Sequence, residues 1–344
     1  WSSDVCSSDL IMTQDKKNHF GSIDCVQLAI YPLILVFGAI GNTLVMLVVR
    51  NKKRNRKIND YFILNLAISD LFMLTISICV DFYLKFQASP YGNVLCKGIW
   101  PFMTMCLFSS VFTLTCMALE RWRTIVKPLC PRFSLSILYL LIALTWFAGL
   151  IFVLPLIIVA YHQGRKCKED WPTFAMRQAY TIAIVAFQYL FPLLIITVAY
   201  ARIESHLKKR SKKIVKIAEG HVSRRGVESI KIILENAKIS KNLRIIVILF
   251  AFFMLPKQIL WLWLDFGNGG KFKHFSDVLT FGEFLLYIHS STNPIVYGTI
   301  LGEYRAGFRR YLRQFFSVIG WHGYLSGIRS TVHPDPTYAA HRAS

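Results

Sequence analysis

The chain has 344 residues and a formal net charge of +21, and 54% of its residues are hydrophobic while only 17% are charged. Soluble domains usually carry about 25% charged residues, so this apolar surplus needs lipid to cover it. The composition excludes a disordered chain, a collagen-like repeat and a small disulfide-rich scaffold. The eight cysteines include no CxxC pair and predict no zinc site.

The first ten residues, WSSDVCSSDL, resemble a translated sequencing adapter rather than protein, and they precede the first methionine, Met12. We therefore leave residues 1–10 out of the fold prediction as foreign sequence. Residues 11–25 are expected to form a short extracellular N-terminus.

Seven long apolar segments follow, separated by short polar stretches. Each has the roughly 20 residues that a helix needs to cross about 30 Å of hydrocarbon. Several contain Pro or Gly, which membrane helices tolerate. The pattern predicts an all-α membrane protein, a seven-transmembrane helix bundle over residues 26–301. Its spans are expected at Val26–Val49, Tyr61–Leu84, Val94–Ile125, Leu135–Ala160, Phe174–Ala201, Leu243–Leu264 and Val278–Leu301.

Lysine and arginine residues are distributed unevenly between the two sides of the predicted bundle. With the N-terminus outside, the inner loops and the tail carry 29 of the 40 Lys and Arg residues but only 8 of the 19 Asp and Glu residues. This positive-inside pattern predicts a multi-pass protein of the plasma membrane with an extracellular N-terminus. Because topology and anionic lipid account for the positive charge, we expect membrane lipid, and no nucleic acid, among its partners.

Residues 303–316 read EYRAGFRRYLRQFF, with aromatic residues at helical spacing and arginines between them. This pattern predicts a short basic amphipathic helix that lies on the inner leaflet. Residues 317–344 are expected to be a cytoplasmic tail.

Polar residues and prolines recur inside the predicted spans. A polar side chain costs free energy in lipid, so its presence there suggests a function. These residues include Gly41-Asn42 in span one, Asp70 in span two, Glu120-Arg121-Trp122 in span three and the run NPIVY at 293–297 in span seven. In this order they resemble the rhodopsin-like (class A) G-protein-coupled receptors. The flanking segments KINDYFILNLAISD and TCMALERWRTIVKP are most similar to neuropeptide receptors.

The resemblance assigns the inner half of the bundle to activation and G-protein coupling. Arg121 resembles the family's switch arginine, and Glu120 is expected to hold it by a charge-assisted pair at rest. Asn236 stands where some members carry an acid, so it cannot provide a second ion pair. Met254 replaces the tryptophan that usually lies two residues before the kink proline. The remaining residues with an implied switch role are Tyr200, Phe250, Pro256, Asn293, Pro294 and Tyr297.

The resemblance also implies a polar cluster at mid-membrane, to which Asn42 belongs. Asp70, Ser110 and Asn293 are similar to the family's site for an allosteric sodium ion, and oxygen ligands suit a hard cation. His289 stands where the family usually has a ligating Asn, and a protonated histidine would repel sodium. A water-filled hydrogen-bond network without sodium is therefore the alternative. No other cofactor is expected.

Cys96 opens span three and Cys167 lies in the second outer loop, and they resemble the family's disulfide pair. An oxidising extracellular face supports this pairing. Cys79, Cys106 and Cys116 fall inside spans and are expected to pack as apolar side chains.

The outer halves of spans two, three, six and seven are expected to form a ligand cavity. Met103 occupies the position at which amine receptors carry Asp, which argues against a monoamine ligand. Asp81 and Glu283 are expected to receive a basic ligand group, and neighbouring aromatic rings can add cation–π contact. The alternative is a Lys257–Glu283 ion pair without ligand contact. The predicted ligand-binding residues are Asp81, Trp100, Met103, Lys257, Gln258, Trp261, Glu283 and Tyr287.

The sequence thus predicts a receptor that binds an extracellular peptide and activates a heterotrimeric G protein through outward movement of span six. Motifs of serine hydrolases, P-loop proteins and zinc proteases are absent, so an enzyme is not expected. Two alternatives stay open. One is a lipid or other small-molecule receptor of the same fold, and the other is a seven-span transporter or channel, which the lack of internal repeats disfavours.

Overall fold

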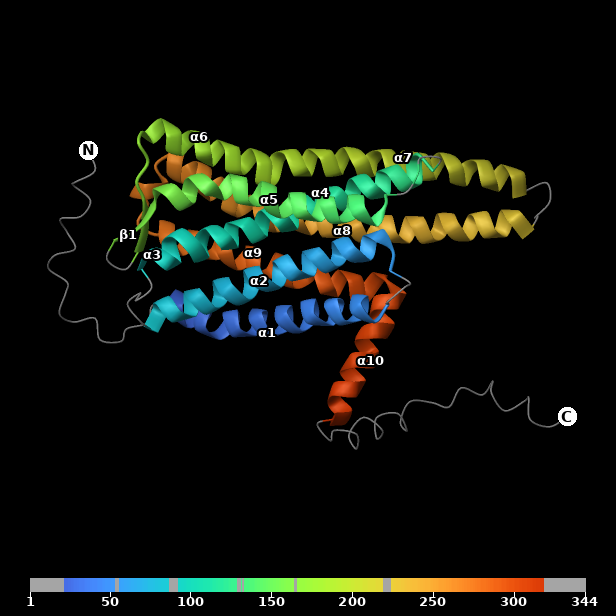
Figure 1. Cartoon of the computed structure of the whole chain (residues 1–344), viewed down its shortest axis with the longest axis horizontal. Helices are drawn as coiled ribbons and strands as arrows, with labels where there is room; N and C mark the ends of the chain where they lie inside the picture. The colour runs from blue at the N-terminus through green and yellow to red at the C-terminus, as the bar shows by residue number, and fades with distance from the viewer. Residues whose placement is uncertain are drawn as a thin grey trace.

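The computed structural model describes residues 22–52, 56–86, 92–128, 131, 133–163, 166–218 and 224–318. Within these residues the chain forms a bundle of long helices that run nearly along one axis, and a final helix projects steeply from one end of the bundle (Figure 1). The predicted all-α seven-transmembrane bundle is confirmed.

The elements follow one another with short connections. The helices are α1 (Ser22–Asn51), α2 (Ile58–Phe86), α3 (Gly92–Val94), the π-helical turn η2 (Leu95–Ile99), α4 (Trp100–Val126), α5 (Leu135–Val159), α6 (Phe174–Val185), the π-helical turn η3 (Ala186–Leu190), α7 (Phe191–Ala218), α8 (Arg224–Phe266), the 3-10 turn η4 (Gly269–Lys271), α9 (Phe275–Ile300) and α10 (Gly302–Val318). The strands are β1 (Ala160–Gln163) and β2 (Lys166–Glu169).

The helices α7 and α8 are longer than the apolar segments that predicted them. The stretch between Ala201 and Leu243 was expected to be a loop, but α7 continues to Ala218 and α8 begins at Arg224. Hydropathy marks the part of a helix that lipid covers, whereas Lys, Arg, Glu and Ile residues continue a helix into water. The side chain of Asn236 lies outside the described residues.

Polarity, rather than length, distinguishes the seventh span from the other six. Among the described residues, six spans are long and apolar enough to cross a membrane, namely those in α1, α2, α3–α4, α5, α6–α7 and α8. Helix α9 has 26 residues, a sufficient length, but it contains His289, Ser290 and Asn293, each 1% exposed. These polar side chains face the inside of the bundle, so α9 can still present apolar residues to lipid.

Helix α4 lies at the centre of the bundle, in contact with α2, α5, α7 and α8. Helix α5 lies at the edge, and its exposed residues are large and apolar, with Phe147 59% and Ile158 74% exposed. An apolar outer surface of this kind is stable only when hydrocarbon covers it.

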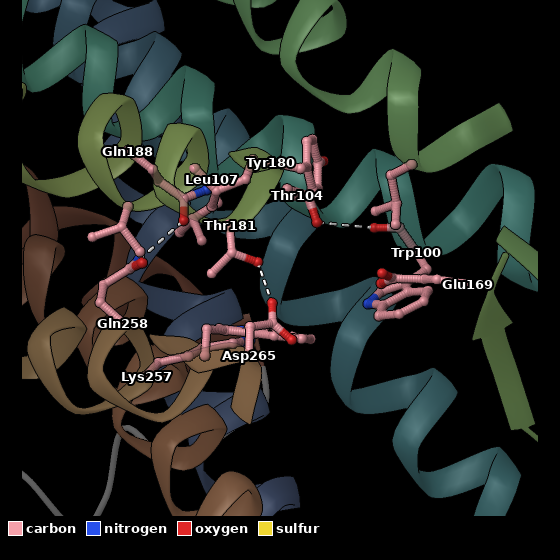
Figure 2. A pocket seen from close by; sticks show the side chains of 14 residues that line it. Trp100, Thr104, Leu107, Glu169, Tyr180, Thr181, Gln188, Lys257, Gln258 and Asp265 are labelled. Atoms are coloured by element: carbon pink, nitrogen blue, oxygen red, sulfur yellow. Dashed lines mark hydrogen bonds between the residues drawn. The ribbon is translucent and has the colours of Figure 1, made fainter. Parts of the chain in front are cut away.

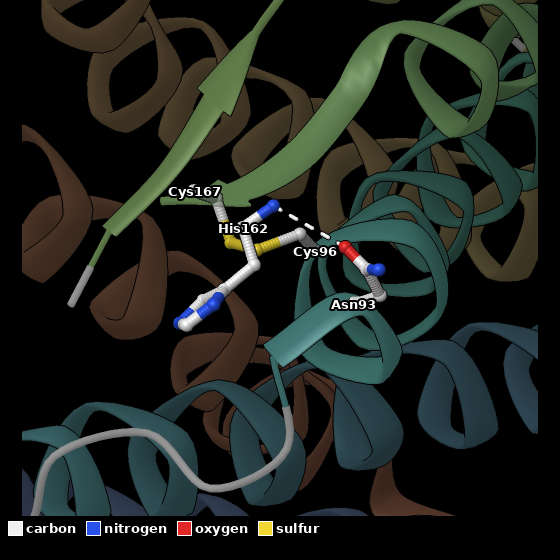
Figure 3. The surroundings of a disulfide bond; sticks show 4 residues. All are labelled: Asn93, Cys96, His162 and Cys167. Atoms are coloured by element: carbon white, nitrogen blue, oxygen red, sulfur yellow. Dashed lines mark hydrogen bonds between the residues drawn. A yellow bond between two sulfur atoms is a disulfide. The ribbon is translucent and has the colours of Figure 1, made fainter. Parts of the chain in front are cut away.

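A disulfide closes one end of the bundle. Cys96 in η2 is bonded to Cys167 in β2, as predicted. The strands β1 and β2 pair antiparallel, with His162 opposite Cys167, and the His162 backbone N–H donates to the Asn93 side chain at 3.3 Å (Figure 3). The disulfide thus fixes this hairpin to the start of the central helix. We call this end of the bundle the disulfide end and the opposite end the α10 end.

At the α10 end, a buried aspartate joins three helices. Asp60 in α2 accepts a hydrogen bond from the Tyr304 hydroxyl at 2.8 Å and pairs with Lys52 at 2.7 Å. Lys52 also pairs with Glu303 at 2.8 Å. Burial, reinforced by the Asp60 charge, raises the pKa of the Tyr304 hydroxyl, which therefore remains a donor at physiological pH. The Tyr304 ring packs on Tyr297 in α9, with centroids 5.7 Å apart.

Tyr304→Phe is expected to lower the melting temperature, because it removes a hydrogen bond to a buried carboxylate while keeping the ring. Such bonds contribute about 1.5–3 kcal/mol, against about 1 kcal/mol for neutral pairs. Tyr311→Phe is the matched control, since the Tyr311 hydroxyl donates to a neutral acceptor, the Leu47 carbonyl, at 3.2 Å. Thermal unfolding of the purified protein measures both, and equal shifts would contradict a special role for Asp60.

Candidate functional site

Two adjoining cavities open at the disulfide end. The first, the α6–α8 cavity, has a volume of about 710 Å³, and the second, the α2–α9 cavity, has a volume of about 1360 Å³. Trp100, Thr104, Leu107 and Lys257 line both. The eight ligand-binding residues predicted from the sequence all line one cavity or both. The α6–α8 cavity contains Trp100, Lys257, Gln258 and Trp261, and the α2–α9 cavity contains Asp81, Trp100, Met103, Lys257, Glu283 and Tyr287.

The α2–α9 cavity carries two acids and one base. Asp81 accepts a hydrogen bond from the Tyr287 hydroxyl at 2.7 Å, and the Tyr31 ring packs edge-on against Tyr287. Lys257 Nζ lies 3.8 Å from Glu283 Oε1, which is the ion pair considered as the alternative. Both groups are partly exposed to the cavity, so the pair does not exclude contact with a ligand.

Met103 contacts a hydroxyl group rather than a charged group. The Ser77 hydroxyl donates to the Met103 sulfur at 2.9 Å. This side of the cavity therefore presents a soft apolar surface, and the acids lie on α2 and α9 instead.

The α6–α8 cavity is held together by polar contacts between α6 and α8. Asp265 is buried and pairs with Arg177 at 2.9 Å, and it also accepts a hydrogen bond from the Thr181 hydroxyl. Deeper in the cavity, Gln258 donates to Gln188 at 3.2 Å. Figure 2 shows the Thr181–Asp265 contact between α6 and α8 and the Gln188–Gln258 contact between η3 and α8.

Sequence reasoning missed Glu169 and Arg177, and it placed Asp265 at the outer cavity without giving it a role in ligand binding. Glu169 lines the α6–α8 cavity and accepts a hydrogen bond from the Trp171 indole at 2.6 Å. Its position two residues after Cys167 was the available signal, because the disulfide fixes that strand at the mouth of the bundle. The Arg177–Asp265 pair gave no local signal, since its members are 88 residues apart in the chain.

The walls of the two cavities are negative overall. Among the described residues, four carboxylates line them, against one lysine, Lys257; the acids are Asp81, Glu169, Asp265 and Glu283. Arg177 compensates Asp265, so a net negative charge is left for a ligand to neutralise. Interactions between charges are stronger in such partly buried sites than in bulk water. The cavities can therefore attract a cationic group.

A polar cluster lies at mid-membrane between α1, α2, α4 and α9. Asp70 accepts hydrogen bonds from Ser110 at 3.2 Å and from the Asn293 amide at 2.6 Å. Asn42 donates to the backbone carbonyls of Gly38 and Ser290. The buried carboxylate of α2 is thus joined to α4 and α9 by hydrogen bonds.

The cluster fits a hard cation in its donor types. The Asn293 side-chain oxygen is buried with no hydrogen-bond partner among the described residues, close to the Asp70 carboxylate that its amide group contacts. Carboxylate, amide and hydroxyl oxygens are the ligands that such ions prefer. The imidazole of His289 is also buried without a described hydrogen-bond partner, and it packs edge-on against Phe250 at 5.7 Å.

Three of the predicted switch residues lie in the α10 half of the bundle, namely Glu120, Arg121 and Tyr297. Arg121 is 7% exposed, and its Nε atom lies 3.3 Å from Glu120, which also accepts a hydrogen bond from Thr124 at 2.9 Å. The Tyr297 hydroxyl is buried without a described hydrogen-bond partner.

Helix α8 carries two further switch residues, Phe250 and Pro256. Pro256 lies inside α8, where it removes one backbone donor. Met254 and Phe250 are fully buried, and Phe250 packs between Tyr189 and His289. Met254 thus fills the core position below the kink that the family usually gives to tryptophan.

Pro294 lies where α9 approaches α1 closely. A Cβ atom on Gly41 would lie 2.9 Å from the Pro294 side chain. Any larger residue at position 41 would push the two helices apart, which explains the glycine before Asn42.

A model of the seven-transmembrane receptors of the rhodopsin family matches residues 41–297, which is most of the chain. The chain belongs to this family. Neuropeptide FF receptor 2 of Rattus norvegicus is 29% identical over 315 residues, covering 85% of the chain and 73% of the relative. Galanin receptor type 1 of Homo sapiens is 30% identical over 302 residues, covering 83% and 81%. The RYamide receptor of Drosophila melanogaster is 29% identical over 309 residues, covering 85% and 64%.

Family membership makes the protein a receptor that couples to heterotrimeric G proteins, and not an enzyme. It also rules out the transporter or channel alternative. In this receptor, the geometry described above separates a ligand-accessible end, with two cavities, from the end that carries Glu120 and Arg121.

Glu120→Gln is expected to raise signalling without ligand, because Arg121 loses its charged partner. Asp277→Asn, a change of the same type at an exposed ion pair with His274, should leave basal signalling unchanged. Basal G-protein activation per receptor at the cell surface measures both variants. Basal activity of Glu120→Gln equal to the wild type would mean that this pair does not restrain the receptor.

Proposed function

We propose that this receptor lies in the plasma membrane with its disulfide end outside, and that it binds a peptide with a cationic group. The observation that carries this proposal is the excess of carboxylates in the two cavities. An incoming Lys, Arg or amino group would contact Asp81 and Glu283, and the rings of Trp100, Trp261 and Tyr287 would add cation–π contact.

The size of the site and the relatives support a peptide rather than a small amine. The two cavities adjoin and share Lys257, so a ligand can extend from α6 to α9. The names of the relatives identify them as receptors for neuropeptide FF, galanin and RYamide. Met103 stands at the position where amine receptors carry Asp. Its side chain has no charge to pair with a monoamine.

Charge and redox chemistry support the proposed orientation. Disulfides persist in oxidising compartments, which favours the Cys96–Cys167 end as the extracellular one. The α10 end carries most of the basic residues, as expected for a cytoplasmic face. Helix α10 itself contributes Arg305, Arg309, Arg310 and Arg313.

Activation follows as a shift between two packings of the bundle. A ligand that contacts α8 through Lys257 and Trp261, and α9 through Glu283, can bind one arrangement of these helices better than another. Outward movement of the inner half of α8, below Pro256, would open the α10 end to a G protein. Release of Arg121 from Glu120 would then supply a cation to that opening.

The charge prediction is tested by amide substitutions. Asp81→Asn and Glu283→Gln should each weaken the potency of a cationic peptide, by roughly 30-fold or more, because a buried charge contact typically contributes about 2–5 kcal/mol. Asn at position 81 keeps an oxygen to accept the Tyr287 hydrogen bond, so the change removes charge rather than shape. Dose–response curves are measured with neuropeptide FF, galanin and a library of basic peptides.

Three further variants serve as comparisons. Met103→Ala should shift potency less than either amide substitution. Asp277 lines neither cavity, so Asp277→Asn should leave potency unchanged. Lys257→Met releases Glu283 and should preserve or improve potency. If both amide substitutions leave potency within about threefold, the ligand does not use these charges, and a lipid or other small-molecule ligand becomes the better proposal.

We further propose that Asp70, Ser110 and Asn293 hold a sodium ion. A bound cation would neutralise the Asp70 carboxylate and favour the resting packing of the helices around it. The unpartnered Asn293 oxygen supports this proposal, whereas the nearby His289 weakens the site.

The sodium proposal predicts that purified receptor melts at a higher temperature in NaCl than in KCl of equal ionic strength. Asp70→Asn should abolish the difference, Glu169→Gln should keep it, and His289→Asn should enlarge it. If wild type and His289→Asn both melt at the same temperature in the two salts, the cluster is a hydrogen-bond network without sodium.

A further inference from the structure

A groove opens between α4 and α7 at the α10 end, separate from the two cavities and from the polar cluster. Its volume is about 1010 Å³. The lining residues that matter for its chemistry are Trp122, Lys127, Val198, Arg202, His206 and Lys209. The ligand and switch roles described above do not use this groove.

The described residues that line the groove gather positive charge and include no acid. Lys127, Arg202 and Lys209 carry the charge, and Lys127 Nζ lies 5.0 Å from the centroid of the Trp122 ring. The acid on this stretch of α7, Glu204, is engaged elsewhere, at 2.9 Å from both Lys208 and Arg244. The groove therefore suits an anion.

Apolar side chains lead from the groove towards the middle of the membrane. On α7, Leu194 is 61% exposed and Val198 is 44% exposed, and they precede Arg202 by two turns and one turn. On α4, Leu119 is 42% exposed and lies one turn before Trp122. Residues at this spacing share a helix face. The groove is thus continuous with the lipid-facing surface of the bundle.

The depth of the charges matches the headgroup layer. The apolar segment that predicted the fifth span ends at Ala201, so Arg202 is the first residue past it. Each further residue advances about 1.5 Å along the helix, which places Lys209 about 10 Å beyond Arg202. Lys and Arg side chains at this level extend towards lipid phosphates.

We propose that this groove binds the multiply phosphorylated headgroup of an acidic phospholipid of the inner leaflet. Lys127, Arg202 and Lys209 would contact the phosphates, and the acyl chains would lie along Leu119 and Leu194. Three cations can neutralise more than one negative charge, which favours a phosphorylated inositol over a headgroup of single charge. The inference rests on the proposed orientation, in which the α10 end is cytoplasmic.

A soluble acidic protein segment is the competing occupant, and the apolar residues decide against it. Such a segment could reach Arg202 and Lys209 from water. It would not cover Leu194, which lies about 12 Å further into the hydrocarbon than Arg202. A phospholipid supplies both the anion and the apolar chain that the groove and its extension require.

The test uses the purified full-length receptor in detergent, titrated with dioctanoyl phosphatidylinositol 4,5-bisphosphate and measured by native mass spectrometry. The groove variant is R202Q/K209Q. The matched control is R210Q/K212Q, which removes the same charge from exposed positions of the same helix outside the groove lining. Each cation near a lipid surface changes affinity about fivefold. We expect binding of the groove variant to weaken by about 25-fold and that of the control to stay within about threefold.

Several outcomes would overturn the proposal. Unchanged binding by the groove variant would remove the site, and equal losses in both variants would indicate diffuse attraction. Equal affinity for free inositol trisphosphate would identify a soluble anion instead of a lipid. A groove variant that binds lipid normally but loses G-protein activation in neutral-lipid nanodiscs would assign the groove to the G protein.

The lipid assay separates this inference from the proposed orientation. Binding in detergent does not depend on which end of the bundle faces the cytoplasm. Antibody labelling, on intact cells, of an epitope inserted between Gln163 and Lys166 tests the orientation independently.

Discussion

Hydrocarbon around the bundle forces the polar side chains of this receptor towards its axis. The outer surface of α5 is covered with residues such as Phe147 and Ile158, while Asp70, Asn293 and His289 are almost fully buried. A polar group in lipid without a partner is costly, so the inside of the bundle, where such groups can contact one another, is the favourable place for them. Asp70 contacts Ser110 and Asn293 in this way.

The same constraint lines up the functional residues along α9. Glu283, Tyr287, Asn293 and Tyr297 recur every three to six residues on the inward side of that helix. They contact Lys257, Asp81, Asp70 and Tyr304 in turn. One helix therefore connects the ligand cavities, the mid-membrane cluster and the junction with α10. A displacement of α9 by ligand would be felt at all three levels.

Lys257 is the charged residue that the two cavities share. It lies one residue past Pro256 and pairs with Glu283 across the α8–α9 contact. A cationic ligand competes with Lys257 for Glu283, so binding and the relation of α8 to α9 are coupled by charge. The competition connects ligand recognition to the helix whose inner half has to move.

The sequence by itself determined the spans, the family and the inward-facing motifs. Hydropathy and motif order both depend on local composition. Hydropathy located the seven apolar segments, and motif order carried the resemblance to the family, which implied the pairing of Cys96 with Cys167. They did not show that α7 and α8 continue past the apolar segments, because lipid-covered length and helix length are different quantities. Only the tertiary structure decided that Glu169 joins the cavity wall, that Arg177 compensates Asp265, and that Tyr304 reaches Asp60. These contacts join residues far apart in the chain, and their distances depend on how whole helices pack rather than on any local pattern.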